Sequence, residues 1–241
     1  MKILVIGDMH GKLPKNIKSI IKKKKVELVI CVGEIPKVPF YRKKNEFRED
    51  YVYRFHKHYK KILEKLDSFK VPVFILKGNE TGKGTRALIK KFKNLTHKYI
   101  GSEMVKGRNF IFFDYLWEER ISNARNFFFD KMAKRNPYRE RRLNKLLGKN
   151  NESVLISHAP PHGYLDVVKN EYTNFKKKHV GSKILLKAIK EYQPPIVFCG
   201  HIHEAKGKAK IGKTKVYNLG ERGYIVMDLD KNKILRSNFL K

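Results

Sequence analysis

The chain contains few cysteines and no long apolar run, and both absences narrow its class. Its 241 residues include two cysteines, Cys31 and Cys199, which lie in apolar runs without the CxxC spacing of metal or redox motifs. We therefore expect two buried free thiols in a reducing compartment. No window approaches the roughly 20 uncharged apolar residues that span a bilayer, and the amino terminus shows no cleavable signal pattern. These absences predict a soluble cytoplasmic protein that does not act at a membrane.

Acidic residues are also scarce, since 23 Asp and Glu stand against 55 Lys and Arg, a formal net charge of +32. Basic residues are dense at 22–25, 42–44, 134–142, 176–178 and 206–215. Such a charge would attract a polyanion, such as RNA or DNA. The other interpretation is a lysine-biased composition, as in some thermophiles, with lysines solvating every face. The dispersed lysines favour this second interpretation, and the clustered arginines at 135–142 favour the first.

Two stretches, 35–69 and 102–150, interleave aromatic with basic residues. Aromatic rings among arginines can stack on bases while the arginines hold phosphates. More often such rings form the buried face of an amphipathic helix whose other face carries lysine. Both interpretations stay open at this point.

Apolar runs typical of strands alternate with amphipathic stretches typical of helices. The strand-like runs are 2–7, 26–33, 71–78, 109–115, 153–160, 195–200, 215–220 and 223–230. The helical stretches are roughly 13–25, 44–69, 84–94, 117–148 and 181–192. Strands and helices alternate early, whereas the last third is mainly strand, so we expect an α/β fold with some antiparallel pairing. No linker or repeat marks a boundary, which predicts a single domain over 1–241, with 102–150 as a basic helical insertion or cap.

Polar side chains follow five of the predicted strands. They are Asp8 and His10 in GDMHG, Glu34 in VGEIP, Asn79 and Glu80 in KGNET, His158 in SHAPPHG, and His201 and His203 in CGHIHE. Strand ends at one edge of an α/β sheet converge on a common crevice. These residues can therefore meet, although they are far apart in the sequence.

The residue types at these strand ends suit metal ions. Carboxylate and amide oxygens with imidazole nitrogens favour Mn, Fe, Zn or Ni over a thiolate-bound centre. Seven such ligands, all of those above except Glu80, are too many for one ion. Two divalent ions about 3.5–4 Å apart would use them all and present a metal-bound hydroxide for attack on phosphorus. The alternative for Asn79 alone is an Asx turn.

In this order, the motifs resemble those of the calcineurin-like metallophosphoesterase superfamily. Its blocks run D-x-H, G-D, G-N-H-[D/E], a strand-end histidine before prolines, and G-H-x-H. The likeness extends over GDMHG, VGE, KGNE, SHAPPHG, CGHIHE and YNLG, which is nearly the whole chain. The resemblance implies a four-layer α/β/β/α sandwich of two mixed sheets flanked by helices. It also implies two metals, one held by Asp8, His10 and His203, the other by Asn79, His158 and His201, with Glu34 bridging them.

Two residues depart from the family pattern. Glu34 stands where members usually bridge with aspartate, and its side chain is one methylene longer. Glu80 stands where many members have a histidine thought to act as a general acid or transition-state contact, and an ionised carboxylate there would repel phosphate. His162 could supply a proton instead, or could be a turn histidine without a role.

Two classes of function follow. The first is a metal-dependent phosphoesterase acting on a phosphomonoester or phosphodiester, such as a nucleotide or nucleic acid, through metal-bound hydroxide. Its catalytic residues would be Asp8, His10, Asn79, His158 and His162. The second is a weakened or inactive phosphoesterase-fold scaffold whose basic surface binds RNA or an acidic complex. Six retained ligands favour the enzyme, whereas the two glutamates and the net charge favour the scaffold.

Overall fold

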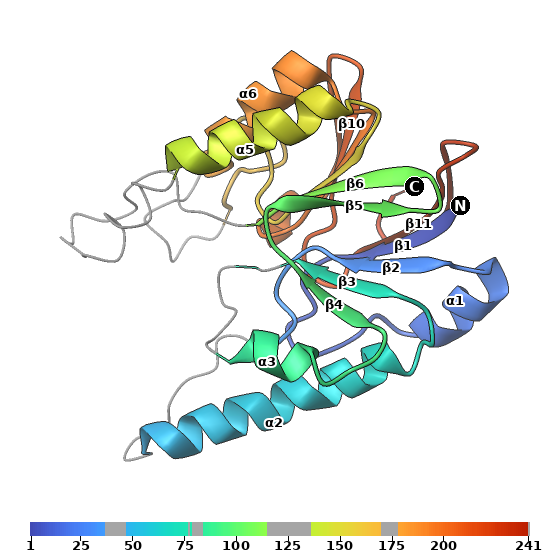
Figure 1. Ribbon diagram of the computed structural model, residues 1–241, viewed down its shortest axis with the longest axis vertical. Helices are drawn as coiled ribbons and strands as arrows, with labels where there is room; N and C mark the ends of the chain where they lie inside the picture. Colours follow the sequence, from blue (N-terminus) through green and yellow to red (C-terminus); the bar gives the residue numbers. More distant parts are fainter. Residues whose placement is uncertain (37–46, 77, 79–83, 115–135, 170–177, 241) are drawn as a thin grey trace.

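Two six-stranded sheets face each other, and helices cover their outer faces (Figure 1). The computed structural model describes residues 1–36, 47–76, 78, 84–114, 136–169 and 178–240. The layers run helix, sheet, sheet, helix. The expected four-layer α/β/β/α sandwich is therefore confirmed.

The first sheet has the strand order β12-β11-β1-β2-β3-β4. Its strands are β1 (Lys2–Ile6), β2 (Leu28–Cys31), β3 (Val73–Leu76), β4 (Leu95–Lys98), β11 (Tyr224–Asp228) and β12 (Lys233–Ser237). Strands β1 to β4 are parallel, and β11 and β12 add antiparallel pairs. Its outer face is covered by α1 (Ile17–Lys24), α2 (Arg48–Asp67) and α3 (Thr85–Ile89) (Figure 1).

The second sheet has the strand order β5-β6-β7-β8-β10-β9. Its strands are β5 (Gly101–Val105), β6 (Arg108–Phe113), β7 (Val154–Ser157), β8 (Ile196–Cys199), β9 (Gly207–Ile211) and β10 (Thr214–Asn218). Helices α5 (Asn136–Lys149) and α6 (Lys183–Tyr192) lie on its outer face (Figure 1). A short 3-10 helix, η1 (His203–Ala205), follows β8.

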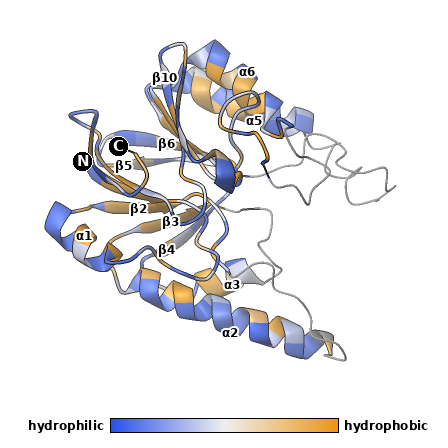
Figure 2. Ribbon diagram, turned by 180° about the vertical axis from the view of Figure 1, so that it is seen from behind, coloured by the Kyte–Doolittle hydropathy of each residue, from blue (hydrophilic) through white to orange (hydrophobic). Residues whose placement is uncertain are grey.

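The alternation of side chains along each strand fills the core on both faces of each sheet. On β1, Ile3 and Val5 pack between the two sheets, while Leu4 and Ile6 pack beneath the helices. Because both faces are buried, the central strands are apolar throughout, as the hydropathy colours of β2 and β3 show (Figure 2). The helices are hydrophilic on the side that faces away from the sheets (Figure 2). The continuous apolar runs of the sequence are thus the inner strands.

The four strands that the sequence does not predict are the four sheet edges, β4, β5, β9 and β12. Strand β9 reads GKAKI and alternates between partly buried and exposed residues along most of its length. Edge strands tolerate lysine and need little apolar surface, since only one neighbour pairs with them. Their sequences therefore lack the apolar run by which the inner strands are recognised.

The described parts of the range 102–150, predicted as a helical insertion or cap, are strands of the second sheet and a helix packed on its core. Residues Gly101–Val105 and Arg108–Phe113 form a hairpin of the second sheet, and helix α5 packs Leu143 and Leu147 into the core beneath it. Residues 115–135 of this range lie outside the described part of the chain. The strand assignment follows from the apolar run of β6, in which four successive residues are buried.

The structure also bears on two features of the composition, the cysteines and the lack of a long apolar run. Cys31 on β2 and Cys199 on β8 are buried free thiols, as expected, and burial raises the pKa of both. Both thiols are therefore unreactive at neutral pH. Across the described helices, none combines the length and the apolar content that a membrane crossing requires.

Helix α5 should contribute to stability as a core element. Leu143 is fully buried, so Leu143→Ala should lower the free energy of unfolding by about 2–5 kcal/mol through lost burial and a cavity. Lys145→Ala, on the exposed side of the same helix, should change it by less than about 0.5 kcal/mol. Urea denaturation followed by circular dichroism measures both variants. Equal, small effects would mean that α5 is a detachable cap after all.

Candidate functional site

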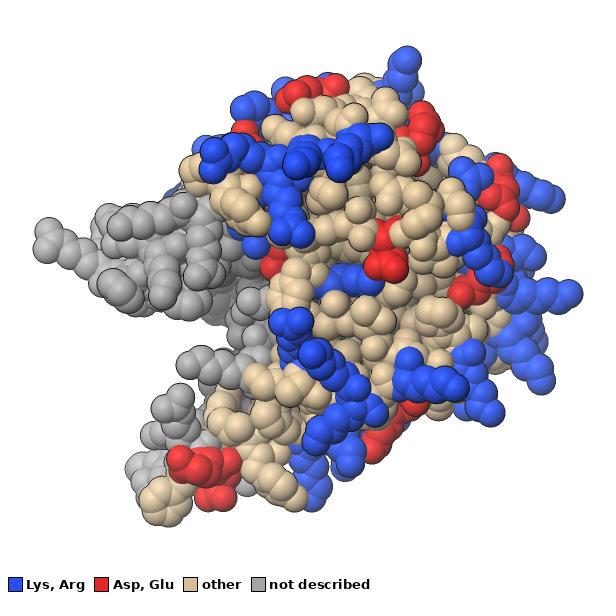
Figure 3. All heavy atoms as spheres, viewed as in Figure 1, with Lys and Arg blue, Asp and Glu red and all other residues tan. Residues whose placement is uncertain are grey.

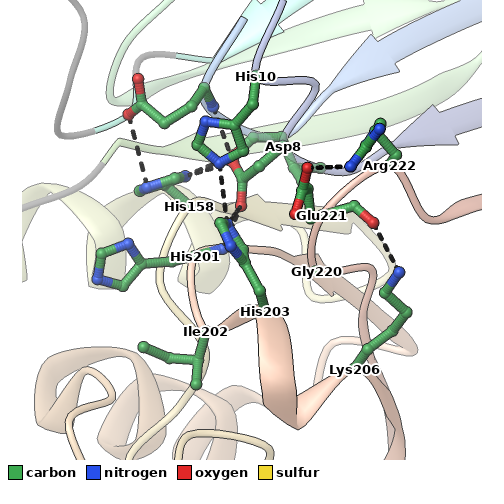
Figure 4. A network of polar contacts seen from close by, with 12 residues as sticks. Asp8, His10, His158, His201, Ile202, His203, Lys206, Gly220, Glu221 and Arg222 are labelled. Atoms are coloured by element: carbon green, nitrogen blue, oxygen red, sulfur yellow. Dashed lines mark hydrogen bonds and ion pairs between the residues drawn. The ribbon is translucent and has the colours of Figure 1, made fainter. Parts of the chain in front are cut away.

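The site lies where the carboxyl ends of strands from both sheets meet. It is formed by residues that follow β1, β2, β7 and β8: Asp8, His10, Glu34, His158, His201 and His203. Figure 4 shows Asp8 among the four histidines of this group. Parallel strands direct their ends to one edge, which is why residues from distant parts of the sequence gather there.

Asp8 is the fixed point of this group. It is fully buried, and its Oδ1 accepts a hydrogen bond from the backbone N–H of Glu34 at 2.8 Å. Its Oδ2 accepts one from the N–H of His201 at 2.6 Å and lies 3.2 Å from Nε2 of His203. The Asp8 backbone is held as well, since its N–H donates to Gly220 O and its carbonyl accepts from Arg222 N–H. The carboxylate therefore has a defined orientation and ties the first sheet to the second.

The four histidines surround this carboxylate in two pairs. Nε2 of His10 lies 3.1 Å from Nε2 of His203, and the rings of His158 and His201 stand 4.9 Å apart (Figure 4). Nδ1 of His158 lies 3.0 Å from the carbonyl of Val32, which can only accept, so Nδ1 carries the proton. In the neutral ring, Nε2 of His158 is then left with a lone pair, the form in which imidazole binds metal.

Two of these histidines have backbone conformations that are costly for residues other than glycine. His10 has φ 45° and His201 has φ 69°, both in the left-handed region. Such strain costs on the order of 1 kcal/mol or more per residue and concentrates at functional sites. Here it occurs at two histidines of the site, one after β1 and one after β8.

Glycines at three strand ends make room for the charged groups. A Cβ at Gly33 would lie under 3.0 Å from Oδ1 of Asp8 and from the ring of His158. A Cβ at Gly78 would clash in the same way with Oε1 of Glu34, and one at Gly200 would lie 2.9 Å from Oδ2 of Asp8. The glycines of VGE, KGN and CGH thus form a cradle that larger residues would fill.

Electrostatics keep the site in a form that can bind metal. Burial alone would raise the pKa of Asp8, but nearby His158, His203 and the His201 N–H hold that pKa well below its usual range. Burial and the neighbouring His158 lower the pKa of His201 to about 3, and burial lowers the pKa of His158. Burial opposes a charge on His203, yet its hydrogen bond to Asp8 raises its pKa. At neutral pH the centre thus holds an anionic carboxylate and neutral imidazoles at His158 and His201.

The donor set fits divalent metals, although the side chains do not form a finished site. Within the described ranges, no group of three or more His, Cys, Asp and Glu side chains could hold a metal ion as it stands. One implied ligand, Asn79, lies outside those ranges. Nδ1 of His10 is buried and makes no hydrogen bond, and ligand-type atoms of three side chains lie 3.1–3.2 Å apart. Atoms bound about 2.0–2.2 Å from one ion are separated by roughly 3 Å, so these contacts match the spacing of ligands.

The remaining predicted residues have different surroundings. Glu34 is buried, and its Oε1 lies 3.8 Å from Nε2 of His158, so its carboxylate reaches the site from the end of β2. The ring of His162 lies beside His179, whose Nδ1 is 2.6 Å from the buried carboxylate of Asp166. The structure therefore places His162 in a second cluster, which the sequence did not indicate. Glu80 lies outside the described residues.

Asp114 is a charged neighbour of the site that sequence reasoning missed. It follows β6 and is buried, and Arg139 of α5 donates to its carbonyl at 2.9 Å and pairs with its carboxylate. The next strand leads to His158, whose N–H donates to Phe113 O at 3.4 Å. The signal was present, because Asp114 follows an apolar run just as Asp8 does. The sequence pattern of 109–115 predicts a strand, and Asp114 lies within that range, so it is not singled out as a strand-end residue.

Comparisons with known proteins agree with this geometry. The family model described as calcineurin-like phosphoesterase matches residues 1–205. The uncharacterized protein MJ1162 of Methanocaldococcus jannaschii is 28% identical over 253 residues, covering 99% of this chain and 97% of that protein.

Solved structures share the fold. One crystal structure superposes with a TM-score of 0.65 at 21% identity over 98% of both chains. The protein TT1561 of Thermus thermophilus superposes with a TM-score of 0.62 at 13% identity, over 98% of this chain and 97% of that chain. At these identities the likeness shows a common architecture.

The glycine cradle can be tested by adding one carbon. Gly33→Ala should lower the free energy of unfolding by about 1–3 kcal/mol, because the new Cβ meets Asp8 and His158, and it should reduce bound metal. Gly101→Ala is the matched control, since a Cβ there meets nothing within 4 Å. Chemical denaturation and elemental analysis provide the two readouts. If the Gly33→Ala protein had normal stability and metal content, the space beside Asp8 and His158 would not require glycine.

Proposed function

Because the chain belongs to the calcineurin-like phosphoesterase family, we propose that it hydrolyses a phosphodiester or phosphomonoester with two divalent metal ions. A nucleotide or nucleic acid is the substrate class that its positive charge would attract. The observation that carries the proposal is the carboxylate of Asp8, held between the N–H groups of Glu34 and His201 and in contact with His203.

The residues present suggest how two ions would be held. Asp8, His10 and His203 would hold one ion, and His158 and His201 would hold the other together with Asn79. Glu34 would bridge them, and the ions would be Mn, Fe, Zn or Ni. When bound, such ions supply an activated water and positive charge for the phosphoryl group. Oδ1 of Asp8 accepts one backbone hydrogen bond and keeps a further lone pair for a cation, whereas Oδ2 accepts the His201 N–H and also contacts Nε2 of His203 at 3.2 Å.

The protein's own contribution is to hold these donors in place before substrate arrives. The backbone bonds fix the Asp8 carboxylate, and Val32 fixes the tautomer of His158. The low pKa values of Asp8 and His201 keep both groups unprotonated, so no proton has to leave them when a cation binds. Preorganisation of this kind lowers the cost of reaching the transition state.

Loss of charge at Asp8 should remove both metal and activity. Asp8→Asn keeps the size of the side chain, but it should lower kcat/KM for a chromogenic phosphodiester with added Mn²⁺ by at least about 100-fold. Bound metal, counted by elemental analysis of protein purified without chelator, should fall as well. His58→Asn is the control, because His58 is an exposed histidine on helix α2.

The same assay separates the enzyme from a scaffold. Chelation should abolish turnover of the original protein, and Mn²⁺ should restore it. The proposal would be contradicted if the original protein, supplied with Mn²⁺, hydrolysed neither a phosphodiester nor a phosphomonoester faster than Asp8→Asn does. That result would favour the second class of function, a phosphoesterase-fold scaffold without activity.

A further inference from the structure

Helix α5 has three faces with different surroundings. Leu143 and Leu147 point into the core of the second sheet. Arg139, in its first turns, pairs with Asp114 at the carboxyl end of β6. The third face is turned to solvent and carries two of the arginines that stood out in the sequence, Arg141 and Arg142.

This third face is a continuous basic stripe. It consists of Tyr138, Arg141, Arg142, Lys145, Leu146 and Lys149, which line a pocket of about 510 Å³ and are called the α5 stripe. The spacing of three, four, seven, eight and eleven residues places them on one side of the helix. Lys145 and Lys149 are exposed, whereas Leu146 is partly buried. Lys and Arg side chains gather over α5 in the space-filling view (Figure 3).

Among the described residues, no acidic side chain pairs with the four cations of the α5 stripe. The nearby acids have other partners, since Glu140 pairs with Lys187 of α6 at 2.8 Å and Asp114 pairs with Arg139. On a surface that is evenly rich in lysine, acidic side chains would lie among the basic ones and pair with them. Here the acid of α5 faces another helix and the stripe keeps a formal charge of +4.

We propose that the α5 stripe binds single-stranded nucleic acid. Arg141 and Arg142 offer planar guanidinium groups that hold phosphates by paired hydrogen bonds. Tyr138 is 55% exposed at one end of the stripe, and its hydroxyl accepts a hydrogen bond from the guanidinium of Arg142 at 3.0 Å. The Tyr138 ring can stack on an unpaired base, and a duplex keeps its bases inside. An acidic peptide would satisfy the cations but has no base to place on the ring.

The position of the stripe relates it to the candidate site. Tyr138 is next to Arg139, whose partner Asp114 lies at the strand ends where His158 is also found. From there to Lys149 the helix extends by about 16 Å, which is enough for a few nucleotides. A strand on the stripe would thus have one end near the metal-ligand candidates. The binding itself does not depend on hydrolysis.

A second basic surface provides a matched comparison. Lys2, Lys23, Lys24, Lys25, Lys231 and Lys233 line a groove of about 380 Å³ together with Asp228 and Leu235, called the lysine groove. It lies at the amino end of β1, away from Asp8, which follows the other end. All of its cations are lysines, and none of these eight residues is an arginine or has an aromatic ring. If net charge were all that mattered, this groove would bind as well as the stripe.

The test compares two triple variants with the same change in charge. Arg141→Gln, Arg142→Gln, Lys145→Gln alters the stripe, and Lys23→Gln, Lys231→Gln, Lys233→Gln alters the lysine groove. Fluorescence anisotropy with a labelled oligouridylate, in EDTA to prevent cleavage, is measured over a range of salt. The stripe variant should bind at least about tenfold more weakly, and its slope of log K against log salt should be smaller by about 2. The groove variant should stay within about twofold of the original protein.

Tyr138 separates stacking from charge. Tyr138→Ala should weaken binding about tenfold, whereas Tyr138→Phe should bind normally, because the ring is kept. Circular dichroism confirms that the variants are folded.

The proposal would be overturned by equal losses of affinity in the two triple variants, by a larger loss in the groove variant, or by no binding to the original protein. The proposal would also be overturned if a duplex of the same length bound more tightly than the oligouridylate, which would favour double-stranded nucleic acid. Displacement of the oligouridylate by polyglutamate of equal charge would favour an acidic peptide instead.

Discussion

The arrangement of the site depends on one buried carboxylate, that of Asp8. Its two oxygens accept backbone N–H groups from the ends of β2 and β8, one strand from each sheet. A buried anion is costly unless it is hydrogen-bonded, so the two sheets must meet in a register that supplies these donors. Burial and the neighbouring His158 keep His201 neutral, whereas the hydrogen bond to Asp8 raises the pKa of His203 against the effect of burial. The interaction that joins the sheets is thus also the one that orients the candidate ligands.

The charge of the protein is divided between this interior and the surface. The interior holds carboxylates and neutral imidazoles, a set that favours cations, whereas the surface accounts for most of the +32. A positive surface raises the local concentration of phosphate esters, and a cation at the centre would extend that attraction inward. The α5 stripe differs from the remaining lysines because arginine and tyrosine add directional contacts to the charge. Both features are consistent with a substrate that carries phosphate.

Strand ends were the part of the site that the sequence showed best. Asp8, His158 and His203 were predicted from motif order, because each follows an apolar run and a ligand must be presented by a short turn. His162 carried a comparable local signal, yet its ring lies beside His179. No local pattern distinguishes a histidine that faces the centre from one four residues later that faces a second cluster. Asp114 carried the same local signal as Asp8, but its pairing with Arg139, 25 residues away, is a contact that no local pattern shows.

By itself, the sequence determined the inner strands, the main helices and the order of the ligand motifs. Those features depend on local periodicity and on residues that follow one another directly. The tertiary structure alone decided which strands form the sheet edges, that β5, β6 and α5 belong to the second sheet and its core, and which acids are already paired. Each of these is a contact between distant segments, and burial or pairing with a distant segment leaves little trace in the residues of either one. The identity of the candidate ligands was local information, whereas their meeting around Asp8 was a property of the fold.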